Sequence, residues 1–128
     1  MREIKLVEVA NLRHIEDYGR KRVIWLYEKI LEEGVWTVPL KLDDTHGLVM
    51  DGQHRMEVAK KLGLKYVPAI LYRYDEVRVW SLRENYEVTP ELVVSRSLAE
   101  NIYPYKTAKH EFPDSGDLMC EYSLDELK

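Results

Sequence analysis

The stretch LVMDGQHR, residues 48–55, contains the feature that decides the fold. Three apolar residues, typical of a buried strand, are followed at once by Asp51, Gly52 and the start of a helical pattern. The first N–H groups of a helix have no partners inside the helix and carry the positive end of its dipole. A glycine lets an anion approach that backbone closely. The stretch therefore predicts an α/β domain with a phosphate site at the turn between strand and helix.

Regular spacing of apolar residues predicts the neighbouring elements. It indicates a helix over residues 20–33, which Gly34 ends in a left-handed conformation. A second helix is expected over 53–62, and a third begins at Thr89-Pro90 and continues to about residue 101. Strands are expected over 4–9, 38–42, 48–50, 66–72 and 77–82, with Pro68 at a sheet edge or bulge. The pattern predicts an α/β (α+β) fold, a small mixed β-sheet with helices packed on it.

Length and charge narrow the class of protein. The 128 residues suit one domain, expected over residues 1–113, followed by a loosely held acidic tail over 114–128. Nineteen basic and 23 acidic side chains give a net charge of −4, which argues against a DNA clamp but leaves a local basic patch possible. Cys120 has no partner for an internal disulfide, and no apolar run suits a signal peptide or a bilayer span. A cytoplasmic protein without a membrane partner is expected; the oligomeric state stays open.

Polar residues in the turn extend the phosphate hypothesis. Arg55 offers a planar donor fork for a phosphate oxygen, and His54 offers a further hydrogen bond. A carboxylate beside a phosphate is repulsive unless a cation lies between them, so Asp51 predicts bound Mg²⁺. The alternative is purely structural: Asp51 caps the helix, Gly52 serves the turn, and the two basic residues are solvated.

The segment MDGQHRMEVA, residues 50–59, resembles the D-G-x-H-R-x-x-A motif of the ParB/sulfiredoxin-like superfamily. This superfamily includes plasmid-partition proteins, sulfiredoxins and free amino-acid (L-serine) kinases. The resemblance implies that fold from the opening strand to His110, with nucleotide binding by Gly52, Gln53, His54 and Arg55. Sulfiredoxins need a cysteine where Gln53 stands. Partition proteins carry a further helix-turn-helix domain and a more arginine-rich phosphate motif, which argues for the kinases.

A second segment, PYKTAKH at residues 104–110, is similar to a P-x-K-T-x-(R/K)-H motif of these kinases. The similarity implies that Thr107, Lys109 and His110 bind the substrate or the transferred phosphoryl group. Tyr105 and Lys109 depart from the proline and arginine expected there, and lysine keeps the charge but loses bidentate geometry. Without the resemblance, this stretch would be interpreted as a solvated basic surface loop.

The kinases also carry an acidic residue just before their first long helix, and Glu16 matches it here. The resemblance implies that Glu16 accepts or orients the proton of the substrate hydroxyl, with Asp51 and His54 as further catalytic residues. Asp17 is the alternative if the match is displaced by one residue, and both carboxylates could simply favour the positive end of the helix. We predict a kinase that uses ATP or ADP and Mg²⁺ to phosphorylate free L-serine or a similar hydroxyl. The competing hypothesis is a ParB-like DNA-binding or nucleotide-sensing module without kinase activity.

Overall fold

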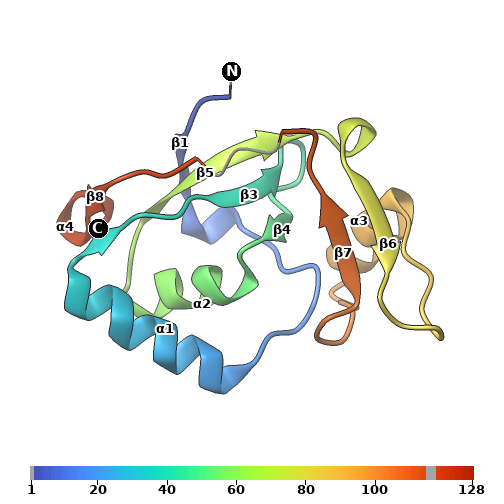
Figure 1. Ribbon diagram of the computed structural model, residues 1–128, viewed down its shortest axis with the longest axis horizontal. Coiled ribbons are helices and arrows are strands. Elements are labelled where there is room, and N and C mark those ends of the chain that lie inside the picture. Colours follow the sequence, from blue (N-terminus) through green and yellow to red (C-terminus); the bar gives the residue numbers. More distant parts are fainter. Residues whose placement is uncertain (1, 115–117) are drawn as a thin grey trace.

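A four-stranded mixed sheet forms the centre of the molecule (Figure 1), in a computed structural model that describes residues 2–114 and 118–128. Its strands are β1 (Lys5–Glu8), β5 (Tyr66–Tyr72), β3 (Leu40–Asp43) and β4 (Val49–Asp51), in the order β1-β5-β3-β4. β3 runs parallel to β5, and the other neighbours are antiparallel. The predicted mixed sheet is confirmed. Pro68 was expected at an edge or a bulge, but it lies in the interior strand β5, opposite Leu6 of β1.

Two helices pack against each other below this sheet in Figure 1, α1 (Arg20–Glu33) and α2 (Gln53–Lys61). α1 has the predicted bounds, and Gly34 ends it with φ 72°. Its apolar stripe enters a core shared with the sheet and α2, to which it contributes Val23, Leu26 and Ile30. Within the described ranges, no helix has both the length and the apolar character that crossing a bilayer requires.

A second layer consists of the antiparallel pair β6 (Arg78–Ser81) and β7 (Ala108–Glu111) together with α3 (Pro90–Leu98). Thr89 caps α3 as predicted, since its Oγ1 accepts the Leu92 N–H at 3.1 Å. The interpretation of residues 104–110 as a surface loop misses β7, in which His110 is buried between the exposed residues Lys109 and Glu111. A second core supports this layer; it contains Ile15, Leu48, Met50, Ile70, Tyr72, Val77, Val88, Val93 and Tyr103.

The end of the chain packs on the main domain. β8 (Tyr122–Ser123) pairs with β2 (Val35–Trp36), and the short helix α4 (Leu124–Leu127) follows it. Leu124 and Leu127 are buried in the same core as α1 and α2. The expectation of a loosely held tail over 114–128 is therefore wrong for its described part, because these leucines complete a core that residues 1–113 leave open. Two 3₁₀ turns, η1 (Val9–Asn11) and η2 (Tyr74–Glu76), complete the described elements.

Candidate active site

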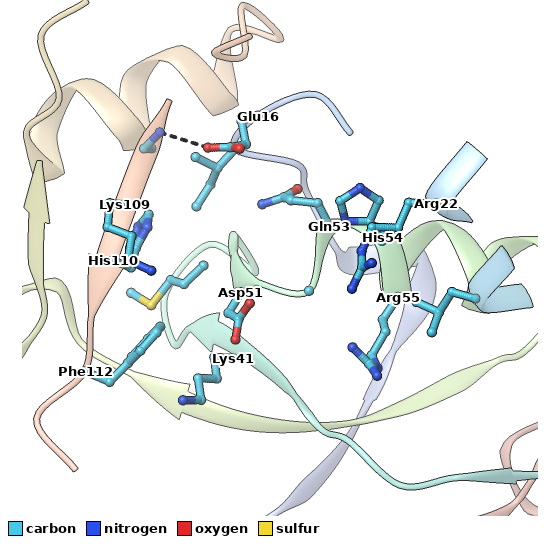
Figure 2. A pocket seen from close by; sticks show the side chains of 15 residues that line it. Glu16, Arg22, Lys41, Asp51, Gln53, His54, Arg55, Lys109, His110 and Phe112 are labelled. Atoms are coloured by element: carbon cyan, nitrogen blue, oxygen red, sulfur yellow. Dashed lines mark hydrogen bonds between the residues drawn. The ribbon is translucent and has the colours of Figure 1, made fainter. Parts of the chain in front are cut away.

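A cavity of about 430 Å³ opens where β4 ends, α2 begins and β7 passes in front of the segment that precedes α1. Figure 2 shows His54, Arg22 and Arg55 on one side of it, Lys109, His110 and Phe112 on the other, and Asp51 between them. Most of the residues predicted from sequence line this one cavity. The lining residues are Ile15, Glu16, Arg22, Leu26, Lys41, Met50, Asp51, Gly52, Gln53, His54, Arg55, Ala108, Lys109, His110 and Phe112.

The first turn of α2 presents backbone N–H groups to this cavity. Gly52 is the N-cap with φ 117°, and no side chain of the described residues caps the helix. The first helical bond is from the Met56 N–H to the Gly52 carbonyl, at 2.8 Å. Among the described residues, no hydrogen bond uses the N–H groups of residues 53–55. The structural alternative for Asp51 as a helix cap is therefore wrong, and these amides can bind an anion.

Glycine is required at position 52 by both conformation and space. A φ of 117° lies in the region that L side chains rarely adopt, and a Cβ there would lie 2.5 Å from Cδ2 of Leu40. Leu40 is fully buried in β3 and has little room to move. Both reasons concern the fold, and the interpretation of Gly52 as the residue that lets the backbone approach a ligand stays a prediction.

Two arginines bring positive charge to the amides of α2. Burial lowers the pKa of the Arg55 guanidinium, Arg22 lowers it further, and Asp51 opposes the shift. Among the described residues, neither arginine has a carboxylate within ion-pair distance. Two adjacent cations without a carboxylate partner form a site for an anionic ligand. Sequence reasoning missed Arg22; the available signal was its position one helical turn before the buried Leu26 on α1.

His54 is a neutral ring that joins the two helices. Its Nε2 accepts the N–H of Gly19, the N-cap of α1, at 3.0 Å. Burial lowers the pKa of His54, and the nearby cations, Arg22 first, lower it further. A neutral ring that accepts at Nε2 carries its proton on Nδ1. His54 can therefore donate one hydrogen bond from Nδ1, as the nucleotide-binding prediction requires.

The Gln53 side chain is hydrogen-bonded within the protein. Its Nε2 donates to the Val49 carbonyl, and its Oε1 lies 2.5 Å from Nδ1 of His14. The amide group is thus engaged on both sides. The predicted nucleotide contact of Gln53 is left to its backbone N–H.

Asp51 is exposed at the end of β4 and lies opposite Lys41 of β3. Lys41 was not predicted; its Nζ lies 4.3 Å from the centre of the Phe112 ring, at one end of the cavity. Within the described ranges, no cluster of three His, Cys, Asp or Glu residues could hold a metal ion by itself. A single carboxylate is nevertheless the usual protein share of a Mg²⁺ site in which phosphate oxygens and water supply the other ligands. Asp51 fits that arrangement.

Glu16 lines the wall of the cavity that faces the start of α2. Its carboxylate accepts backbone N–H groups of Lys106 at 2.8 Å, Thr107 at 3.4 Å and Ala108 at 2.9 Å, the last drawn as the dashed line in Figure 2. Burial raises the pKa of Glu16, and these backbone bonds oppose the shift. Asp17, the alternative, is exposed, accepts the N–H of Tyr18 and lies outside the cavity lining. The structure therefore places Glu16 at the site and Asp17 away from it.

The three residues predicted to bind substrate in the 104–110 segment do not all reach the cavity. Lys109 and His110 line the cavity from β7. Thr107 does not: it is fully buried, and its Oγ1 donates to the Pro104 carbonyl at 2.7 Å. The predicted substrate contact of the Thr107 side chain is wrong for this reason. Its hydroxyl shapes the turn that brings N–H groups to Glu16.

His110 is a buried, neutral ring on the β7 side of the cavity. Its Nε2 lies 3.0 Å from the Tyr74 hydroxyl. Burial lowers the pKa of His110 to about 4, with Lys109 acting in the same direction and the nearby Ala108 backbone opposing. Nδ1 is buried and has no hydrogen bond of normal geometry among the described residues. Because this nitrogen has almost no accessible surface, the ring lines the cavity with its other atoms.

Solved structures carry the same arrangement of elements. A free serine kinase in complex with AMP superimposes with a TM-score of 0.87 over 98% of this chain and 93% of that chain, at 16% identity. The chain has the free serine kinase fold. A glutamate-to-alanine variant of a free serine kinase in complex with ADP gives a TM-score of 0.86 at 16% identity, over 98% and 94% of the two chains. SbnI with a C-terminal truncation, from Staphylococcus aureus, gives 0.84 at 13% identity, over 98% and 89%.

Sequence similarity points the same way over part of the chain. An ATP-dependent L-serine kinase of Staphylothermus marinus is 38% identical over 78 residues, which are 58% of this chain. The matched stretch is only 31% of that relative's length. The chain matches no protein-family model. The predicted resemblance to the free amino-acid kinases is thus confirmed for the free serine kinase fold and for a partial sequence match.

Proposed function

We propose that this chain transfers a phosphoryl group from a nucleotide to the hydroxyl of a free hydroxy amino acid, with L-serine as the first candidate. One observation carries the proposal: a single cavity holds the open N–H groups of α2, two arginines with no carboxylate partner in the described part of the chain, and the Glu16 carboxylate on the facing wall. The relatives named as an ATP-dependent L-serine kinase and as free serine kinases with AMP or ADP support it. Either ATP or ADP could serve as the donor.

The donor phosphates would bind at the start of α2. The N–H groups of residues 53–55 and the guanidinium groups of Arg55 and Arg22 would surround them, and His54 would donate from Nδ1. Phosphoryl transfer proceeds through a loose transition state, so positioning and charge neutralisation provide most of the catalysis. The cavity's residues suit this task better than they suit covalent chemistry. No cysteine lines it.

Asp51 would hold Mg²⁺ together with the donor phosphates. The ion would supply positive charge against the phosphate oxygens, and it would remove the repulsion between Asp51 and the donor. The Lys41 ammonium lies on the neighbouring strand and adds charge of the same sign. We therefore expect phosphoryl transfer to require Mg²⁺.

Glu16 would accept or orient the proton of the substrate hydroxyl. A carboxylate has about four acceptor positions, and three backbone N–H groups occupy three of them. One position remains for the hydroxyl. Lys109, on the same wall, would bind the carboxylate of the amino acid, and the ring of His110 would line its site.

The direct test is a product assay. The protein is incubated with Mg²⁺, ATP or ADP, and a panel of free hydroxy amino acids, and phosphorylated product is detected by mass spectrometry. Arg55→Ala should abolish transfer while the melting temperature stays close to that of the wild type. Arg73→Ala, at an exposed ion pair with Asp75, is the matched control and should keep full activity. Full activity of Arg55→Ala would reject the role of the turn.

The competing hypothesis uses the same turn without the chemistry. A DNA-binding or nucleotide-sensing module would bind ADP or a duplex at α2 but would have no need of Glu16. If no product forms with any acceptor, and a DNA duplex shifts in a salt-dependent manner, the regulatory hypothesis replaces the kinase.

A further inference from the structure

His14 connects the segment that carries Glu16 to the first two turns of α2. Its side chain is 14% exposed, and both ring nitrogens have partners on α2. Nδ1 lies 2.5 Å from Oε1 of Gln53, and Nε2 lies 2.6 Å from Oε2 of Glu57. None of the roles proposed above for the cavity residues involves this histidine. It lies behind the phosphate site and outside the cavity lining.

The partners of His14 determine its charge. Gln53 donates from Nε2 to the Val49 carbonyl, so its amide oxygen must face His14. Burial alone would raise the pKa of Glu57, but hydrogen bonds from His14, Lys60 and Tyr18 outweigh it, and the pKa is lowered. The ionised Glu57 carboxylate can only accept. A ring between two acceptors makes both bonds only as the imidazolium, which donates from both nitrogens.

The backbone of the same segment is attached to the opposite layer. The His14 carbonyl accepts Oγ of Ser97, on α3, at 2.6 Å. Tyr103 donates its N–H to the Ile15 carbonyl at 3.0 Å and accepts the Asp17 N–H at 2.9 Å. Glu16 is therefore held on one side by the α3 and β7 layer. The His14 side chain links this segment to the side chains of α2, as the bond from the Gly19 N–H to His54 does further along the chain.

We propose that His14 is a positioning residue: held as the imidazolium by Glu57 and Gln53, it sets the position of the Glu16 carboxylate relative to the phosphate-binding N–H groups of α2. This inference rests on the proposed function. Transfer requires the acceptor oxygen and the donor phosphorus to be aligned, and a displacement of about 1 Å can cost on the order of 100-fold in rate.

The test compares His14→Gln and Glu57→Gln with the wild type. Each should lower kcat by about tenfold or more, while the dissociation constant for ADP, measured by calorimetry, changes by less than about threefold. The double variant should lose little more than either single variant, because both remove the same link. His46→Gln is the matched control: His46 also pairs with a carboxylate, that of Asp43, but it lies outside the cavity lining. It should keep the wild-type kcat.

A second measurement does not depend on the variants folding well. ¹⁵N chemical shifts of the His14 ring in the wild type should show both nitrogens protonated near neutral pH. A ring with one protonated nitrogen, or a His14→Gln variant as active as His46→Gln, would overturn the inference while the proposed function stands. A wild-type protein that phosphorylates no acceptor would instead refute the proposed function, and the positioning role with it.

Discussion

The Glu16 carboxylate accepts the N–H of Ala108 at 2.9 Å, across 92 positions of sequence. This bond joins the segment before α1 to the start of β7, and both residues line the cavity. Glu16 therefore has a structural task besides any catalytic one. A variant at this position needs a stability measurement beside the activity measurement.

Glu16→Gln should separate these two tasks. An amide places an N–H₂ group against backbone donors, so we expect the free energy of unfolding to fall by about 1–3 kcal/mol. Activity should fall by about 100-fold or more, because the base for the hydroxyl is removed. Chemical denaturation and the product assay measure the two effects. Asp17→Asn is the matched control, since Asp17 is an exposed neighbour outside the cavity; a comparable loss of activity there would contradict the assignment of Glu16.

Gly52→Ala should damage both the fold and the phosphate site. The left-handed φ of 117° costs a non-glycine residue about 1–3 kcal/mol, and the new Cβ would press on Leu40. The N–H groups of α2 should move, so ADP affinity should fall as well. Gly63→Ala is the control: φ there is 69°, but no atom lies within 4 Å of the added Cβ, so only stability should change. Equal ADP affinity in both variants would show that the amides do not hold the nucleotide.

His110 should make the protein less stable in mild acid. Its pKa falls from an ordinary 6.5 to about 4 in the folded state. Between pH 6.5 and about 4, the His110 ring is protonated in the unfolded chain but stays neutral in the folded chain. The folded state therefore loses stability as the pH falls toward 4. The loss approaches about 3 kcal/mol. Urea unfolding at several pH values measures it.

His110→Gln should reduce that acid dependence, because glutamine does not titrate. The comparison between variant and wild type isolates His110 from His54, whose pKa is also lowered, and from Glu16, whose raised pKa acts in the opposite direction. An unchanged slope in His110→Gln would mean that the ring is not neutral in the folded protein.

Leu127→Ala should test whether the end of the chain belongs to the domain. Leu127 is fully buried in the main core, and truncation of such a leucine costs about 2–5 kcal/mol. Leu82, 56% exposed, is the control and should change stability by less than about 0.5 kcal/mol when replaced by alanine. Thermal unfolding gives both values. A loosely held tail would predict equal, small effects.

The sequence predicted the parts of the molecule that depend on local patterns. The helix over residues 20–33 follows from the spacing of its apolar residues and the glycine after it, and its bounds are confirmed. The strand–glycine–helix turn at Gly52 follows from residue types that are adjacent in the chain. The motif match also brought Glu16, Lys109 and His110 to the site, although their roles stay predictions. Their convergence in one cavity needed the fold.

Other features depended on contacts between distant segments. β7 was missed because its only buried side chain is a histidine, which stands between charged residues and gives no apolar alternation in the sequence. That histidine, His110, is buried only because Tyr74 and the second core surround it in the fold. Thr107 has a hydroxyl suited to a ligand, but the turn of its own loop uses it. Arg22 and Lys41 carry no motif, and only the cavity shows that they face the same ligand space.

By itself, the sequence determined the fold class, the long amphipathic helix and a strand–glycine–helix turn, because these follow from periodicity and from the conformational freedom of one glycine. Tertiary structure alone decided that Glu16 rather than Asp17 faces the cavity, that Thr107 is buried, and that His14 joins two layers. The physical reason is that a side chain's charge and hydrogen-bonding capacity are set by neighbours up to 92 positions away, and those neighbours are chosen by packing.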